Sequence, residues 1–473
     1  MSFENDLDKA IRAGVPDQRR RLKDAWDNLQ FANARFHDYP TQITEAGYQR
    51  DTRYRRTAPI MQRIVHTLTA NLYRRNPART LASDTATSYL DAFYRRNGMG
   101  AKWRRADQLT LISDVAAFQF AGTENPAAPI RIHLWSSDSF VVWTDPTDPA
   151  APVAVATLDL LGDRRRLRLW TAEEVSTYLS PVTAGDFGRG PTAAYVRHST
   201  APNPYRREDG TGILPFAFAH AQPVTDGFWS HGPGHNLRVV NDAVNFGLDE
   251  LGDGVRYLAK PIGLAEGVAS SWTPPFEIKP GMFLALPSDR SAAGTFNNPS
   301  LRYLSPELGF IESCWADLNN YIDLSLEMHG VPPSTFRMTA PAASGVAIVA
   351  ENGPILDWAE QRRQPFSHYE QEVAVVACAV GASHLREYEP AIAAELESAA
   401  NNPGFSMRWG PLYFPLPGPD RDASDAFRLD RGLASSIDIL QEREDLTREQ
   451  AIARIEQIKE DEAKYGNADN PMI

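Results

Sequence analysis

The sequence predicts an α+β fold, because helical and strand patterns occupy separate blocks of the chain. Apolar residues recur at three- and four-residue intervals in 17–36 and 57–73, which is the period of an amphipathic helix. From residue 130 to 170 the pattern changes to alternating or β-branched runs, which favours strands. Two long helical patterns follow, separated by short strands and turns. At 473 residues, two or more packed regions are expected.

Three helices are predicted before the strand region. The first two span residues 17–36 and 57–73, and Ile60, Ile64 and Leu68 share one face of the second. The third runs through "KWRRADQLTLISDVAAF". The arginine-rich pieces "RDTRYRR" and "YRRN" flank the second helix, and a solvated helix face accounts for them better than a phosphate-binding patch.

An antiparallel β region is predicted next. Its strands are Ile130–Trp135, Ser139–Trp143, Val153–Leu161 and Arg164–Trp170. Gly162 and Asp163 form the turn between the last two. The segments "AAYVRH" and "LPFAFAHA" extend the region, and the Pro- and Gly-rich loops between strands are expected to be exposed.

Two long helices are predicted to enclose a small β insertion at 273–302. The apolar stripe of the first consists of Leu237, Val240, Val244, Leu248, Leu251, Val255 and Leu258, and Pro261 ends it. The second begins with Ser305 as the N-cap and Pro306 in the first turn. Its stripe consists of Ile311, Trp315, Leu318, Ile322 and Leu326, and it stops at Gly330.

The polar side of the second long helix is acidic. Between Arg302 and Arg337 the chain has five acids and no Lys or Arg. These acids are Glu307, Glu312, Asp317, Asp323 and Glu327. A helix usually mixes the two signs, which gains about 0.2–0.5 kcal/mol per i,i+4 pair. Two interpretations stay open: a solvated acidic face, and a surface that repels a polyanion.

A run of small, mostly uncharged residues follows, "RMTAPAASG". The next helical pattern contains Pro354 and Pro365, so a kinked helix is expected. "GFSMRWGPLYFPLP" is predicted to be a strand, and two short helices are predicted to close the chain. Leu433, Ile437 and Leu440 mark the first of these helices, and Thr447 with Gln450 forms a capping box for the second.

No catalytic residue, cofactor or metal is predicted. The sequence has no GxxxxGK[ST] or GxGxxG phosphate-binding motif. Ser344 lacks the first glycine and the strand of a nucleophile elbow. The Gly-Pro-Gly between His231 and His235 prevents the helix that would aim both rings at one metal. Cys314 and Cys378 have no metal-ligand spacing and are expected to be reduced core thiols.

Charge and hydropathy disfavour two classes of partner, DNA and membranes. Residues 1–110 carry 20 Lys+Arg and 12 Asp+Glu, a net charge of +8, so the remaining residues carry a net charge of −20 and the chain totals −12. The acidic remainder argues against stable DNA binding, which needs many cations. No run of 18 apolar residues occurs, and "MSFENDLDKAIRAG" lacks the features of a signal peptide. We therefore expect a soluble protein made in the cytoplasm, without a membrane partner.

The order of these elements resembles the portal proteins of tailed bacteriophages, of the siphophage type, over nearly the whole chain. Its most specific pieces are "GVPPSTF" with "ASGVAI", and "RGLASSIDIL" before "LTREQAIARIEQI". The resemblance implies a wing, a two-helix stem, a small β-containing clip, a long kinked helix and an α-helical crown. The implied ranges are 1–230 for the wing, 231–262 for the first stem helix, 263–304 for the clip, 305–331 for the second stem helix, 332–346 for the channel loop, 347–419 for the kinked helix with a returning wing strand, and 420–473 for the crown.

The resemblance also implies a function. Such a protein forms a homo-oligomeric ring, typically a dodecamer, at one capsid vertex of the virion, after assembly in the host cytoplasm. Double-stranded DNA is packaged and later ejected through its channel, with transient, non-specific contact. The implied partners are the terminase large subunit, the major capsid and scaffolding proteins, and a head–tail adaptor. The terminase would hydrolyse ATP, and the ring would nucleate procapsid assembly with the capsid and scaffolding proteins.

The loop after the second stem helix would face this DNA. By position its residues are Arg337, Met338, Thr339, Ala340, Pro341, Ala342, Ala343, Ser344 and Gly345. Small uncharged residues suit sliding, because each fixed cation adds a phosphate contact to break. The five stem acids would line the channel and keep DNA off its wall, whereas Arg302 and Arg337 at the ends of the acidic segment could bind phosphate. Two alternatives stay open: a soluble hydrolase with a scattered catalytic site, and another oligomeric capsid or adaptor protein.

Overall fold

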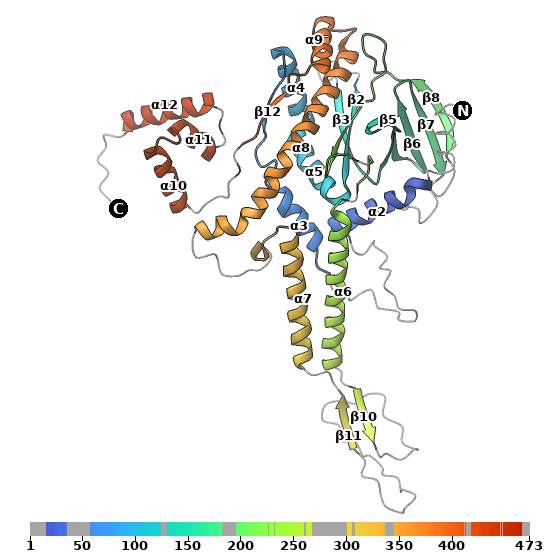
Figure 1. Ribbon diagram of the computed structural model, residues 1–473, viewed down its shortest axis with the longest axis vertical. Helices are drawn as coiled ribbons and strands as arrows, with labels where there is room; N and C mark the ends of the chain where they lie inside the picture. Colours follow the sequence, from blue (N-terminus) through green and yellow to red (C-terminus); the bar gives the residue numbers. More distant parts are fainter. Residues whose placement is uncertain are drawn as a thin grey trace, which may run out of the picture. The chain divides into compact units, whose positions relative to one another are not determined.

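The computed structural model confirms the α+β class, with α-helices and antiparallel sheets (Figure 1). It describes residues 16–35, 57–123, 130–181, 195–225, 227–230, 232–259, 262–266, 300–304, 308–335, 345–410, 412, 418–444, 446 and 448–465. The chain divides into two compact units. The first comprises Met1–Pro40, Pro59–Arg238 and Leu326–Ile473, and the second comprises Thr41–Ala58 and Val239–Ser325.

The described residues before the sheets of the first unit form α2 (Pro16–Ala32), α3 (Ile60–Thr69), α4 (Asp84–Asn97) and α5 (Met99–Ser113). Helix α4 was not predicted, although Ser83 caps it by accepting a hydrogen bond from the Ala86 N–H at 3.0 Å. The predicted helix that ends in "DVAAF" is wrong over its last residues. Asp114 has a φ of 74°, its carboxylate accepts the Ser230 N–H at 2.6 Å, and a strand begins at Val115.

The strands of the first unit form two larger antiparallel sheets. The three-stranded sheet has the order β3-β2-β9, with β2 (Val115–Gly122), β3 (Ile130–Ser136) and β9 (Phe216–His220). The five-stranded sheet runs β4 (Phe140–Asp145), β5 (Asp148–Leu161), β6 (Arg164–Thr171), β7 (Glu174–Pro181) and β8 (Val196–Pro202). The predicted β5–β6 turn is confirmed, with Gly162 at a φ of 61°. Strand β7 was missed, because its inward-facing Ser176 and Ser180 hide the alternation of apolar residues.

Aromatic side chains fill the core around the three-stranded sheet. On one face, the Trp103 ring of α5 lies 4.5 Å from that of Phe118 and 6.1 Å from that of Phe366. On the opposite face, Phe218 packs on Phe140 of the five-stranded sheet, with the ring centroids 6.0 Å apart. The three-stranded sheet is therefore a middle layer between helices and the second sheet, and its strands are buried on both faces.

The C-terminal part of the first unit contains α8 (Gly345–Leu385), α9 (Pro390–Asn401), α10 (Gly418–Asp430), α11 (Ser436–Glu444) and α12 (Arg448–Tyr465). Helix α8 contains both prolines and bends along its course, as expected (Figure 1). The short strand β12 (Ser406–Arg408) pairs with β1 (Ala78–Thr80). The described residues contain three helices after 417 where two were predicted. Leu433 lies before α11 and is exposed, and Thr447 lies outside the described residues.

The second unit contains most of α6 (Gly234–Ala259) and α7 (Leu308–Met328), together with β10 (Ile262–Glu266) and β11 (Ser300–Leu304). The two strands pair antiparallel, with Ile262 opposite Leu304. Gly247 faces Leu318 and Gly254 faces Ile311, so the helices run antiparallel and close together. The predicted strands and turns at 273–302 lie outside the described residues, except for the start of β11.

Candidate functional site: an acidic helix pair and the anchor of helix α8

The α6–α7 pair is strongly acidic. The two helices together carry eight acids and two arginines, and α7 itself has no Lys or Arg. Of the predicted channel-lining acids, Glu312, Asp317 and Glu327 are exposed and Asp323 is half-buried, whereas Glu307 lies outside the described residues. Negative charge without interleaved cations disfavours contact with a polyanion such as DNA.

The acids of α7 do not all share one face. At 100° per residue, Glu312, Asp323 and Glu327 lie within about 60° of one another around the helix axis. Asp317 falls on a different side, together with Tyr321 and Leu324. The helix therefore has one acidic stripe of three residues and a second, mainly apolar side that carries a single acid.

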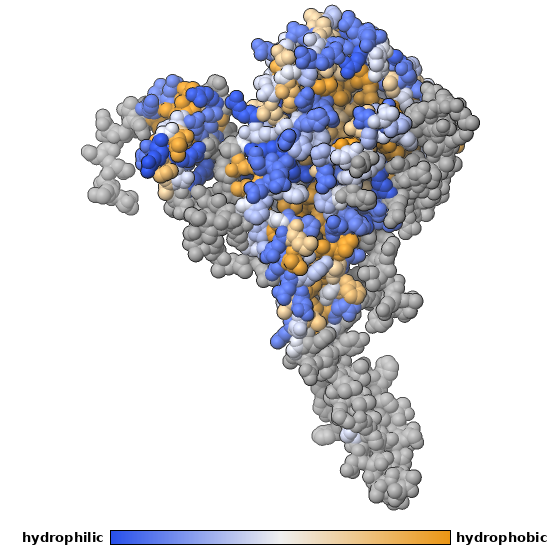
Figure 2. Space-filling model, viewed as in Figure 1, coloured by the Kyte–Doolittle hydropathy of each residue, from blue (hydrophilic) through white to orange (hydrophobic). Residues whose placement is uncertain are grey.

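This second side of α7 is exposed. Leu324 is 56% exposed and Met328 is 77% exposed, and Tyr321 is exposed beside them. Helix α6 adds exposed Val239 and Phe246, and Figure 2 shows apolar side chains at the surface of the helix pair. Exposed apolar residues gathered on one element indicate a surface that another molecule covers.

The predicted apolar stripes are only partly buried. Leu251 of α6 and Leu318 of α7 are buried between the helices, but Trp315 is 53% exposed and Val255 is exposed. The reason is geometric, because two helices in contact bury only the narrow strip that faces the partner. Gly247 lies in that strip, where an added Cβ would come to 2.9 Å from a Leu318 methyl.

Helix α7 ends where the sequence predicted. Gly330 has a φ of 69°, and the Val331 N–H donates to the Leu326 carbonyl at 2.9 Å. A glycine in the left-handed conformation is a common way for a helix to end. Of the predicted channel loop, Arg337, Met338, Thr339, Ala340, Pro341, Ala342, Ala343 and Ser344 lie outside the described residues, as does the N-cap Ser305. Gly345 is the first residue of α8, so the role of the loop remains a prediction.

A buried carboxylate fastens α8 to the N-terminal helices. Glu370 is fully buried, and its oxygens accept hydrogen bonds from the Arg79 Nε at 2.9 Å, the Tyr73 hydroxyl at 3.1 Å and the Tyr94 hydroxyl. Burial opposes the charge of Arg79, but Glu370 outweighs it and raises the arginine pKa. Burial and the Glu370 charge raise the pKa of Tyr73 and Tyr94 far above the usual value, so both hydroxyls stay protonated donors.

A second buried ion pair lies two turns earlier on α8. The Arg362 Nε donates to Asp107 at 2.8 Å, and its Nη2 donates to the Thr110 hydroxyl at 2.7 Å. Burial raises the pKa of Asp107, and the charge of Arg362 opposes that rise. The two ion pairs hold the part of α8 after Pro354 on β1 and α5, and the Tyr94 hydroxyl adds a contact from α4.

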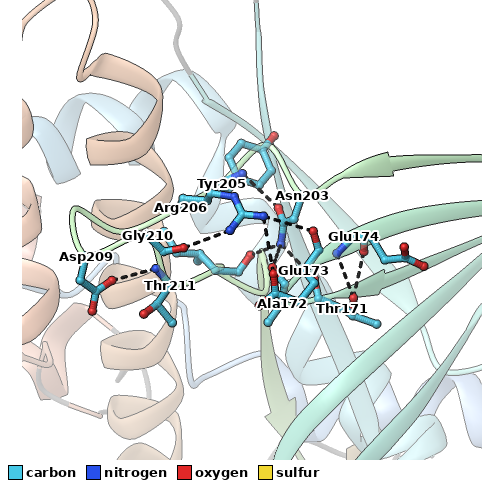
Figure 3. A network of polar contacts seen from close by, with 11 residues as sticks. Thr171, Ala172, Glu173, Glu174, Asn203, Tyr205, Arg206, Asp209, Gly210 and Thr211 are labelled. Carbon is cyan, nitrogen blue, oxygen red and sulfur yellow. Dashed lines mark hydrogen bonds and ion pairs between the residues drawn. The ribbon is translucent and has the colours of Figure 1, made fainter. Parts of the chain in front are cut away.

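The far end of α8 is held by the loop between β8 and β9. Buried Asn203 donates to the carbonyls of Thr171, Ala172 and Ile213 at 2.9–3.2 Å, which closes the loop on the β6–β7 turn (Figure 3). From this loop the Arg206 N–H donates to the Ser383 hydroxyl of α8 at 3.0 Å. The end of the long helix is thus fixed to the five-stranded sheet.

These anchoring residues were not predicted from the sequence. The available signal is a charge within an apolar stripe: Glu370 follows Phe366 by four positions and precedes buried Val373 by three. A buried acid is stable only when it is paired. The pattern therefore shows that a partner exists without showing which arginine it is.

The histidines and cysteines noted in the sequence differ in their exposure. His235 is exposed, and His231 lies outside the described residues. Cys378 is buried, which raises its thiol pKa to about 12, and Cys314 is half-buried. Among the described residues no three His, Cys, Asp or Glu side chains gather as metal ligands. None of the described helices is long and apolar enough to span a membrane.

The chain is distantly similar to solved structures of phage-like particles. No protein-family model and no curated protein matches the chain. The chain is similar to a solved structure described as the neck of an empty gene transfer agent (GTA) particle, at 14% identity and a TM-score of 0.40, covering 80% of this chain and 87% of that one. It is also similar to a structure of the virion of a native GTA particle, at 13% identity and a TM-score of 0.38, covering 86% and 96%. At such TM-scores neither likeness supports a functional argument.

Proposed function

We propose that this protein is a phage-type portal protein. Copies of the chain form a ring, typically of twelve, at one capsid vertex, and DNA enters and leaves through the central channel. The observation that carries the proposal is α7, which combines a stripe of three acids, an absence of Lys and Arg, and an exposed apolar side. A helix of this kind suits a wall that repels DNA on one side and contacts a neighbouring subunit on another.

The proposed mechanism is that of a passive conduit. The stripe of Glu312, Asp323 and Glu327 repeats in every copy and surrounds the channel with negative charge. The loop that ends at Gly345 contacts the passing DNA, and the buried ion pairs hold the part of α8 after Pro354 in place. The motor activity belongs to a terminase, and capsid, scaffolding and head–tail adaptor proteins complete the vertex.

The test is ring formation and its dependence on α7. Negative-stain images of the purified protein are expected to show rings with a central hole, and native mass spectrometry about twelve subunits. Leu324→Glu places a charge on the exposed apolar side and is expected to abolish rings. Leu160→Glu is the matched control, because Leu160 of β5 is also about half exposed. Rings that persist in Leu324→Glu would refute this assignment of the interface, and compact monomers at high concentration with scaffold present would refute the portal function.

A further inference from the structure

Among the described residues, no strand pairs with the outer edge of β9 in the three-stranded sheet. Strand β9 is the last strand in the order β3-β2-β9. The Phe120 N–H donates to the Pro215 carbonyl at 2.9 Å and the Ala221 N–H to the Asp114 carbonyl at 2.7 Å, which sets the hydrogen-bonding register with β2. In this register Ala217 and Ala219 bond to β2, and the N–H and C=O of Phe218 point to the open edge.

A cavity of about 690 Å³ lies along this edge. Its lining includes Phe218 from one face of β9 and Ala217 from the other. Val375 and Val376 of α8 line it on one side, and Pro152 of β5 lines it on the other. Because residues of both sheet faces and of both neighbouring layers border it, the cavity is a groove at the edge of the sheet.

The walls of this groove are mainly apolar, with polar groups at defined places. Tyr369 of α8 lines the groove beside His220, and the two ring centroids lie 6.0 Å apart. The Glu372 carboxylate, about two-fifths exposed, lies 3.1 Å from the His368 ring nitrogen. An apolar groove beside unpaired strand groups is the arrangement that accepts an added strand.

We propose that the groove binds an extended segment of a separate protein. The segment adds a strand to β9, pairs with the backbone of Phe218, and inserts apolar side chains into the cavity. The acidic group of Glu372 favours a Lys or Arg near one end of the segment. A second copy of this chain is a poorer match, because β8, exposed at all seven residues, carries the mainly polar sequence "VRHSTAP". The proposal does not depend on ring formation.

The probe is a fluorescent heptapeptide in which Val alternates with Thr before a final Lys. Fluorescence anisotropy with the full-length protein measures binding, and hydrogen–deuterium exchange measures the amide of Phe218. The expected result is saturable binding with exchange at Phe218 slowed about tenfold or more, because the amide gains a hydrogen bond. A peptide with two neighbouring prolines at its centre is expected not to bind, since proline cannot donate to a strand.

Protein variants locate the binding. Val376→Trp fills the groove and is expected to weaken binding about tenfold or more, whereas Leu161→Trp on the exposed end of β5 is expected to leave it unchanged. Equal binding of the proline peptide, an unchanged exchange rate at Phe218, or no saturable binding would overturn the proposal. Strong protection of Phe218 without peptide that disappears on dilution would assign the groove to a second copy and also overturn it.

Discussion

Removal of the Glu370 carboxylate is expected to destabilise the first unit strongly. In Glu370→Ala the Arg79 guanidinium, whose side chain is 8% exposed, loses its counter-ion, and the hydroxyls of Tyr73 and Tyr94 lose their acceptor. Breaking one partner of a buried ion pair costs about 3–5 kcal/mol, because the remaining charge stays buried. Because the two buried hydroxyls lose their acceptor as well, we expect the total to lie near the upper end of that range.

The assay is urea unfolding monitored by tryptophan fluorescence. Trp103 reports on this site, because its ring stacks on that of Tyr73 with the centroids 5.8 Å apart. Glu370→Ala is expected to lower the free energy of unfolding by about 3–5 kcal/mol. The double variant Arg79→Met with Glu370→Met removes both charges and is expected to recover most of that loss, because apolar replacement of a whole buried pair is often neutral. A loss below about 1 kcal/mol in Glu370→Ala, or a double variant as unstable as the single one, would refute the reasoning.

Two further predictions test the packing and the buried histidine. Gly212→Ala makes the new Cβ clash with the Ala172 carbonyl oxygen and is expected to cost about 3 kcal/mol in urea unfolding. The control Gly162→Ala, at positive φ in open space, is expected to cost about 1 kcal/mol, and equal losses in the two variants would contradict the close contact. Burial lowers the pKa of His220 to about 4, so its contribution to stability is present above pH 6.5 and is lost as the pH falls through 4. The wild-type protein is expected to lose about 3 kcal/mol more than His220→Gln between pH 7 and pH 4, and parallel pH profiles of the two proteins would contradict this.

Much of the local structure was predictable from residue patterns. The alternation in 130–170 identified β3, β4, β5 and β6, because a strand with one buried face repeats every two residues. The stop of α7 at Gly330 was predictable for a similar local reason, since glycine adopts positive φ without steric cost. Helix α4 also had a local signal in Ser83, Leu90 and Phe93 that the prediction did not use.

The sequence by itself determined the class of fold, the two long helices and the cation-free acidic surface of α7. These features depend on short-range periodicity and on residue identity, which the chain carries wherever it folds. Only the tertiary structure decided that β2 begins at Val115, that β9 has an open edge beside a cavity among the described residues, and that Glu370 pairs with Arg79. That last pair spans 291 positions of the chain. Local patterns show that a buried charge needs a partner, and only packing selects which partner comes within hydrogen-bonding distance.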